Sequence, residues 1–243
     1  MTDFGLIFSF FAIVAGAIAS VAGFGIGSIL TPILAVSIGT KLAVSAVCIP
    51  HLAASFWRCW LLRQHIDKKV LLNFGITSAV GGFAGALLHA QAQSYLLTVL
   101  FGSLLVLVSV LGLTGLDAKL RFGRKRSGIA GAVSGMLGGM VGNQGGIRSA
   151  AMLNFNLSKE AFVGTATAIG VIVDLARLPV YLACEAKELF ALWPSIVMAT
   201  ACTLLGTFLG MKLLIHVPQK IFKKVVASII LVLGFAVLLR GSV

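Results

Sequence analysis

Long uncharged apolar runs, joined by short basic loops, constrain this chain more than any other feature of its sequence. Hydrophobic residues make up 59% of the chain and charged residues only 11%, a balance outside that of soluble domains. A membrane-spanning helix needs roughly 20 apolar residues, so the chain has room for about eight to ten crossings. The composition therefore predicts an all-helical polytopic membrane protein without a soluble domain.

The net charge of +12 falls mainly in loops between the apolar runs. Because cytoplasmic loops are rich in Lys and Arg, we interpret this charge as an orientation signal and not as a nucleic-acid site. The loops around Lys68, Arg124 and Lys223 are expected in the cytoplasm, and an acidic loop at Glu185 outside. The first apolar run, residues 4–22, follows Asp3 without a Lys or Arg, which favours a retained membrane segment over a cleaved signal peptide.

Two glycine-rich stretches, residues 23–27 and 142–146, interrupt apolar runs. A helix broken at membrane depth is tolerated where protein or a water-filled cavity satisfies its backbone, and the N-terminus of a following helix attracts anions. Arg148 follows the second break, and a guanidinium can hold an oxyanion with two parallel hydrogen bonds. The alternative is that Arg148 snorkels to an interface or balances a buried acid such as Asp174.

We therefore predict a small anion bound between the two breaks. Its binding residues are Gly142, Asn143, Gln144, Gly145, Gly146, Arg148 and Ser149 on one side, and Gly25, Gly27 and Ser28 on the other. Cys48, Cys59, Cys184 and Cys202 lack metal-site spacing and fit packing roles. No motif of hydrolytic, nucleotide-binding or metal chemistry stands out, so the sequence predicts neither an enzyme nor a cofactor or metal site.

The two halves of the chain resemble duplicated units. An offset of 119 positions aligns Gly23 with Gly142, Gly27 with Gly146 and Arg58 with Arg177, and a G-x-F-x-G pattern recurs at Gly81 and Gly206, an offset of 125. We predict a first repeat over residues 1–116, a basic cytoplasmic loop over 117–126 and a second repeat over 127–243. Each repeat would be a glycine-broken hairpin followed by three helices, at residues 41–62, 70–90 and 95–116, and at residues 161–182, 189–215 and 225–239.

The expected orientation of the basic loops relates the repeats to each other. The first hairpin would open outward and the second inward, which is an inverted-topology repeat of the kind found in many secondary transporters. The predicted mechanism is alternating access.

Four further residues are candidates for proton coupling or gating. His51 lies near the middle of its predicted helix and titrates near neutral pH, although a core histidine fits as well. Asp174 and Arg177 are spaced to pair locally, either as a structural ion pair near the outer helix end or as a gate. For Arg58, which lies among Trp57 and Trp60, anchoring at the cytoplasmic interface is the favoured interpretation.

The two breaks, VAGFGIGSILTPIL and MVGNQGGIRSAAML, resemble the duplicated motif of the TauE/SafE-type sulfite exporter family. The resemblance covers essentially the whole chain. It implies a permease of the bacterial or archaeal inner membrane that moves small sulfur-containing anions, such as sulfite or organosulfonates, coupled to the proton gradient. Ile26, Asn143 and Gln144 interrupt the family's glycine runs, and Arg148 stands where an apolar residue is expected.

Two other classes of function remain open from the sequence. A passive anion channel or facilitator would use the same site without coupling, and a non-transporting membrane subunit would use the glycine faces for packing. The expected partners are a small anionic substrate and membrane lipids, without nucleic acid, and a homo-oligomer is compatible with the sequence.

Overall fold

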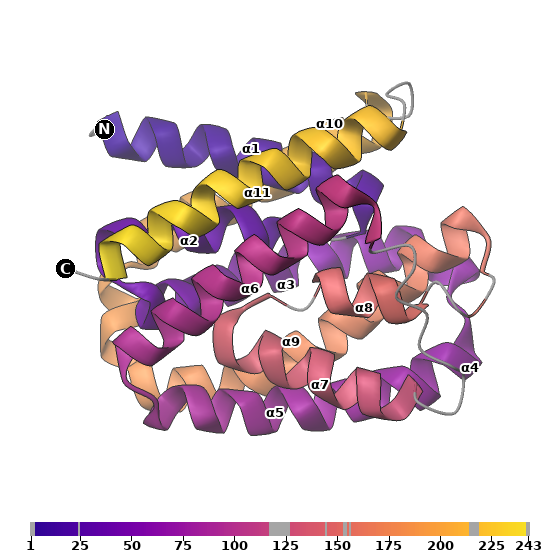
Figure 1. Cartoon of the computed structure of the whole chain (residues 1–243), viewed down its shortest axis with the longest axis horizontal. Coiled ribbons are helices and arrows are strands. Elements are labelled where there is room, and N and C mark those ends of the chain that lie inside the picture. The colour runs from indigo at the N-terminus through magenta and orange to yellow at the C-terminus, as the bar shows by residue number, and fades with distance from the viewer. Residues whose placement is uncertain are drawn as a thin grey trace.

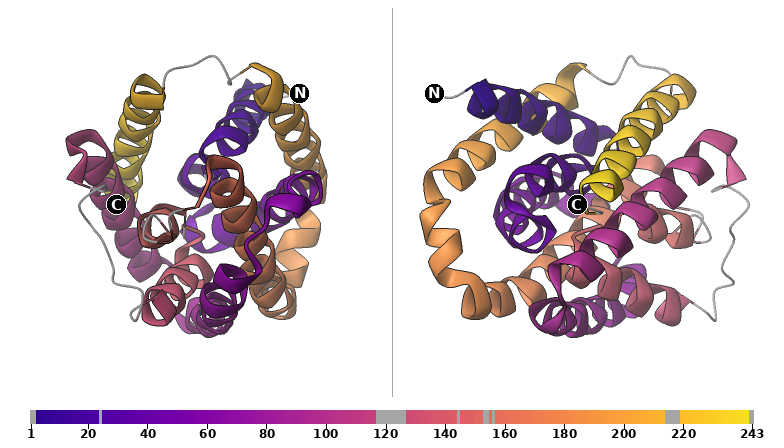
Figure 2. Two further views of the ribbon diagram at one scale, coloured as in Figure 1. Left: turned by 90° about the vertical axis from the view of Figure 1, so that its right-hand side faces the viewer. Right: turned by 60° about the vertical axis from the view of Figure 1, so that its left-hand side comes forward.

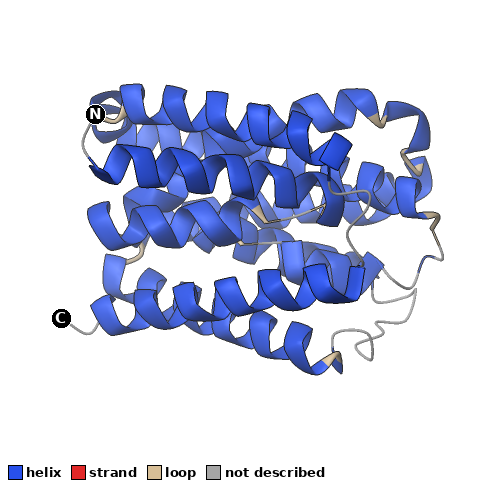
Figure 3. Cartoon of the chain, turned by 90° about the horizontal axis from the view of Figure 1, so that it is seen from above, coloured by secondary structure: helices blue, strands red, loops and turns tan. Residues whose placement is uncertain are grey.

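The computed structural model describes residues 3–23, 25–116, 127–143, 145–152, 155, 157–213 and 219–241. These residues form helices and short connections, without a β-strand among them (Figure 3). In chain order the elements are α1 (Asp3–Ala22), α2 (Ile26–Ile38), α3 (Thr40–Leu61), the 3-10 turn η1 (Arg63–His65), α4 (Lys68–Val70), the π-helical turn η2 (Leu71–Gly75), α5 (Ile76–Gln91), α6 (Ser94–Thr114), α7 (Ser127–Val141), α8 (Gly145–Met152), α9 (Lys159–Ala191), α10 (Trp193–Leu213) and α11 (Gln219–Gly241). The prediction of an all-helical protein is confirmed.

Five helical segments in the described part of the chain are long and apolar enough to cross a membrane. They are Thr40–Leu61, Lys68–Gln91, Ser94–Thr114, Glu160–Ala191 and Trp193–Lys212. Large apolar side chains such as Leu72, Ile129 and Phe235 are exposed on the surface of the molecule, where lipid would cover them. The basic loop predicted over residues 117–126 lies outside the described residues.

Both glycine-rich stretches break a helix. Gly23 and Gly142 follow α1 and α7 with φ angles of 75° and 72°, a left-handed conformation that favours glycine. The chain then turns back into α2 and α8, which have 13 and 8 residues. At 1.5 Å per residue these helices are about 20 and 12 Å long, shorter than the bilayer's hydrocarbon core of about 30 Å. Neither return helix can span the membrane by itself.

The predicted acidic loop around Glu185 is instead a kink between two helical segments of α9, which ends at Ala191. Glu185 lies at the kink, with φ and ψ of −132° and 24°. The loop was expected because charged residues interrupt the apolar run there. Alanine, glutamate and lysine are nevertheless good helix formers, and the Glu185 side chain is buried against α5 instead of extending into water.

The two halves of the chain pack through one another and do not form separate domains. The main helix pairs are α1 with α10, α5 with α7, α3 with α9, and α6 with α11 (Figures 1 and 2). Each pair takes one helix from residues 1–116 and one from residues 127–241. Neither half could therefore bury its apolar faces alone in this arrangement.

Glycines allow the closest of these approaches. The contacts in question join a glycine to the backbone of the opposite half: Gly81 with Ala132, Gly85 with Met136, Gly206 with Ile13, and Gly210 with Ala17. The glycines of the first two contacts are related to those of the last two by the offset of 125, and the residues that they contact are related by the offset of 119. The G-x-F-x-G pattern is thus a packing signature, used in the same way in both halves.

Replacing Gly206 by Ala should destabilise the protein because the added Cβ would overlap the backbone of Ile13 on α1. Overpacking of this kind costs about 1–3 kcal/mol. Thermal unfolding of the purified protein in detergent measures the effect. Gly128→Ala is the matched control, since its Cβ would make only an ordinary contact of 3.7 Å with Thr77 Cγ2. A Gly206→Ala variant as stable as the control would contradict the close packing of α1 and α10.

Candidate functional site

The two helix breaks contact each other at the centre of the molecule. A Cβ at Gly27 would overlap the carbonyl oxygen of Gly142, so the two backbones approach as closely as only glycine permits. Beside this contact, Ser28 Oγ donates a hydrogen bond of 3.1 Å to Asn143 Oδ1. Segments more than a hundred residues apart in sequence thereby form one site.

A small polar cavity lies at this contact. Its lining comprises Gly25, Gly27, Ser28, His51, Gly142, Asn143, Gly145 and Arg148. All of them except His51 belong to the predicted binding set, and His51 was predicted for coupling. The cavity volume of about 10 Å³ is close to the least that one water molecule needs. An oxyanion of four or more heavy atoms would need the cavity to widen.

Arg148 is buried beside this cavity, and some of its hydrogen-bond donors are unsatisfied. Its guanidinium packs on the backbone of Gly170 in α9, where an added Cβ would lie 3.2 Å from Nη1. Its Nε and Nη1 atoms are buried without a hydrogen-bond partner, and so is Nδ2 of Asn143. Buried donors of this kind are costly unless an acceptor satisfies them. The burial rules out the alternative in which Arg148 reaches a surface of this chain.

His51, Asp174 and Arg177 form a buried network next to the cavity. His51 Nδ1 donates to Asp174 Oδ2 at 2.5 Å, and Asp174 Oδ1 accepts from Arg177 Nε at 3.0 Å and from Nη2 at 2.8 Å. His51 Cε1 also lies against Gly170, across from Arg148. The local Asp174–Arg177 pair was predicted, either as a structural pair near the outer helix end or as a gate. It lies about midway between the start of α9 at Lys159 and the kink at Glu185, which contradicts the position near the helix end and leaves the gate as a prediction.

Two arginines, one from each half, cap the broken helices. Arg58 donates from Nη1 to the carbonyl of Ala19 in the last turn of α1, and Arg177 donates from Nη1 to the carbonyl of Gly138 in the last turn of α7. Both arginines and both carbonyls are related by the offset of 119. A cation at a helix C-terminus offsets the partial negative charge there, so each arginine stabilises the end that its break creates.

The interfacial role favoured for Arg58 is therefore wrong. Arg58 is 2% exposed and also donates from Nη2 to Ser55 Oγ at 3.1 Å. Its neighbours Trp57 and Trp60 are exposed, which explains why the sequence around it has the composition of an interface. Arg58 lies on the opposite face of α3, where its guanidinium contacts the carbonyl of Ala19 in α1.

Positive charge is in excess at this centre. Among the described residues, Arg58, Arg148 and Arg177 are buried there, against one carboxylate, Asp174. Arg177 and His51 already contact that carboxylate. At the position of Asp174 in the first half, 119 residues earlier, stands Ser55, which is neutral. Two guanidinium charges are thus left without a contacting carboxylate, which makes the site attractive to an anion.

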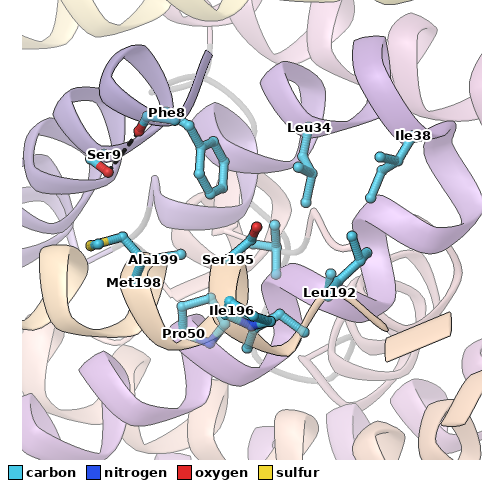
Figure 4. A pocket seen from close by; sticks show the side chains of 14 residues that line it. Phe8, Ser9, Leu34, Ile38, Pro50, Leu192, Ser195, Ile196, Met198 and Ala199 are labelled. Carbon is cyan, nitrogen blue, oxygen red and sulfur yellow. Dashed lines mark hydrogen bonds between the residues drawn. The ribbon is translucent and has the colours of Figure 1, made fainter. Parts of the chain in front are cut away.

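A larger cavity, of about 270 Å³, lies apart from this centre between α1, α2, α3 and α10 (Figure 4). Phe8, Leu34, Pro50 and Ile196 are among the side chains that line it, and its lining includes no charged residue. An anion would find only the Ser9 and Ser195 hydroxyls there, and Ser9 Oγ already donates to Gly5 O at 2.8 Å. The small polar cavity therefore fits the predicted ligand better than the large one.

Three predicted binding residues are not placed in the cavity lining. Gln144 lies outside the described residues, as do the surroundings of Gly146, while Ser149 lies in α8 but does not line the cavity. Gly170, which the sequence analysis missed, lies between Arg148 and His51. The offset of 119 relates it to His51 and could have pointed to it. In the described part of the chain no three His, Cys, Asp or Glu residues gather as metal ligands would.

Comparison with known proteins assigns the chain to a family. The family model described as "Sulfite exporter TauE/SafE" matches residues 8–237, nearly the whole chain. No curated protein and no solved structure matches it.

Replacing Arg177 by Met should destabilise the protein more than replacing Arg58 by Met. The first change leaves the buried Asp174 without its guanidinium, and breaking a buried ion pair costs about 3–5 kcal/mol. The second removes a buried charge that has no contacting carboxylate, so lost helix capping is its main cost. Chemical unfolding in detergent compares the two variants. Equal destabilisation would show that the caps, and not the ion pair, dominate.

Proposed function

Because the chain belongs to the TauE/SafE sulfite exporter family, we propose that it is a secondary transporter for a small sulfur-containing oxyanion, such as sulfite or an organosulfonate. The family and the apolar helices make it a multi-pass membrane protein of a transporter family. The membrane in which it works is, on this proposal, the cytoplasmic membrane of a bacterium or archaeon.

The observation that carries the proposal is the excess of buried positive charge beside unsatisfied donors. Arg148 Nε and Nη1 and Asn143 Nδ2 border one cavity without acceptors, and α2 begins there without a side chain capping its first turn. Sulfite and sulfonate groups present three oxygens and accept hydrogen bonds only. An oxyanion would therefore satisfy the guanidinium, the amide and the helix N-terminus together.

Transport requires that the cavity open alternately to the two sides. A cavity of about 10 Å³ has to widen for the anion, and the contact of Gly27 with Gly142 is where the two halves would part. Inverted repeats move in this way, by one repeat rocking against the other around a central site. The equivalent glycine contacts and arginine caps of the two halves support a twofold relation between them.

A proton on the His51–Asp174 pair would couple transport to the proton gradient. His51 borders the anion cavity and contacts the carboxylate that partly offsets the arginines. Adding a proton to this pair raises the positive charge at the cavity by one and strengthens the binding of an anion. Loss of the proton weakens it, so anion and proton would cross together.

Arg148→Ala should abolish anion binding while the protein remains folded. We expect the wild-type protein to be stabilised against thermal unfolding by sulfite or a small sulfonate, by about 2.7 kcal/mol at a hundred times the Kd. The Arg148→Ala variant should show no such stabilisation. Arg148→Lys should retain part of it, because a lysine keeps the charge but not the planar fork.

Arg63→Ala provides the matched control, since Arg63 is exposed and its guanidinium lies over the Trp60 ring. It should bind anions like the wild type. Wild-type binding by Arg148→Ala would exclude the proposed site. The absence of stabilisation by any sulfur oxyanion in the wild type would argue against the substrate class.

His51→Gln should separate exchange from coupling. In proteoliposomes the variant should still exchange internal for external anion, because Arg148 remains in place. Uptake driven by an imposed pH gradient should fall by about a hundredfold, the low end of the typical effect of losing a proton-transfer group. His65→Gln, at an exposed position, is the control. Undiminished gradient-driven uptake in His51→Gln would make His51 a core histidine.

A further inference from the structure

A second set of buried titratable groups extends from the central site along one face of α9. Asp174, Arg177, Tyr181 and Glu185 are spaced by three or four residues, which puts them on one side of the helix. All four are buried, with Glu185 the most exposed at 8%. The face leads from the anion cavity to the C-terminal end of α9.

The equivalent positions of the first half share only the arginine, and α3 ends at Leu61 before two of them are reached. The offset of 119 relates the four α9 residues to Ser55, Arg58, Leu62 and Ile66. Beyond the capping arginine, the first half therefore has two aliphatic residues where the second has a tyrosine and a glutamate. The scaffold is repeated in both halves, but the titratable face is present in only one of them. This difference indicates that Tyr181 and Glu185 have a function at the end of the molecule where α9 ends, and that the first half has no counterpart to it.

Glu185 lies at the end of this face beside a fully buried histidine. Its Oε1 is 3.5 Å from Nε2 of His89 on α5, and neither carboxylate oxygen has a hydrogen bond. His89 Nδ1 donates to the carbonyl of Met140 at 2.7 Å, and its Nε2 faces both Glu185 Oε1 and, at 3.4 Å, Ser45 Oγ. A buried carboxylate is unfavourable without a compensating positive charge, and a proton shared with His89 would supply one.

The other groups around Glu185 do not neutralise it directly. From α3, Lys41 Nζ donates to the carbonyls of Ala90 and Ala92 at 2.7 and 3.2 Å. Ser45 Oγ, also on α3, lies 3.4 Å from His89 Nε2. From α9 itself comes Tyr181, and α7 contributes the Met140 carbonyl. Lys41 uses two of its three donors on the end of α5, and its positive charge acts on Glu185 from a distance.

Tyr181 connects this outer pair to the centre. Its ring lies 5.0 Å from the ring of His89, and the guanidinium carbon of Arg177 lies 5.8 Å from the centre of the same ring. Its hydroxyl donates to the carbonyl of Gly139 at 2.5 Å, next to the Gly138 carbonyl that Arg177 caps. From Glu185 to Asp174 the helix rises about 16 Å, so the two acids are separate sites joined by polar groups.

We propose that Glu185 and His89 form a second proton-binding site, which loads protons from the aqueous side that the C-terminal end of α9 faces and supplies them to His51 and Asp174. The proposal rests on the proton coupling in the proposed function. A proton from water binds to the Glu185 carboxylate or to His89 Nε2. Because the Tyr181 hydroxyl donates to the Gly139 carbonyl and Arg177 keeps its protons, the transfer to His51 and Asp174 takes place through water that enters along this face when the two halves part. By the positive-inside rule, this end of α9 is the outer one.

The test compares Glu185→Gln with Glu188→Gln, an exposed position one turn further along α9. In proteoliposomes, Glu185→Gln should exchange anions at the wild-type rate, and uptake driven by a pH gradient should fall by about a hundredfold or more. His89→Gln should behave in the same way, while Glu188→Gln should match the wild type in both assays. Wild-type gradient-driven uptake in Glu185→Gln would overturn the proposal.

A measurement without any anion keeps this proposal separate from the proposed function. The thermal stability of the purified protein should depend on pH through protonation of the buried pair. Glu185→Gln should lose part of this dependence, and Glu188→Gln should keep it. If the wild type transports no sulfur oxyanion but this difference is found, the proposed function fails and the proton site stands. An unchanged pH profile in Glu185→Gln would exclude the site whatever the protein transports.

Discussion

A helix that breaks inside a bilayer has to satisfy its free backbone groups within the protein, because lipid offers no hydrogen bonds. In this chain Arg58 and Arg177 donate to the Ala19 and Gly138 carbonyls in the last turns of α1 and α7, which also accept from the Gly23 and Gly142 amides. Burying two guanidinium groups for this purpose is costly without counter-charge. Arg177 pairs with Asp174, so the two charges without a contacting carboxylate are those of the cap Arg58 and of the cavity residue Arg148. Part of the positive centre that an anion can fill therefore comes from the capping of a broken helix.

The two halves share their scaffold and differ in their chemistry. Glycine contacts, left-handed glycines and arginine caps recur at equivalent positions. The functional candidates do not recur: Asp174 corresponds to Ser55, His51 to Gly170, and Arg148 to Ile29. In the proposed mechanism, the equivalent positions belong to two halves that part around a central contact. The positions that differ hold the charge and the titratable groups of the candidate site.

Much of the candidate site could be predicted because a glycine cluster within an apolar run usually marks either a break in a helix or a close contact between helices. The two breaks, Arg148 and the paired G-x-F-x-G patterns were all visible in the sequence, and the structure brings the breaks together. The errors at Glu185 and Arg58 have a common physical origin. A charged residue in an apolar run was assigned to a loop or an interface, whereas tertiary contacts with His89 and Ala19 bury both side chains.

The sequence by itself determined that the chain is helical, that it belongs in a membrane, and where its helices break. Composition decides the first two, and the breaks follow from glycine's access to positive φ. Only the tertiary structure decided which charges face one another. His51 and Asp174 lie 123 residues apart in the chain and 2.5 Å apart in space. Such pairs depend on how α3 and α9 cross, and helix periodicity contains no information about that crossing.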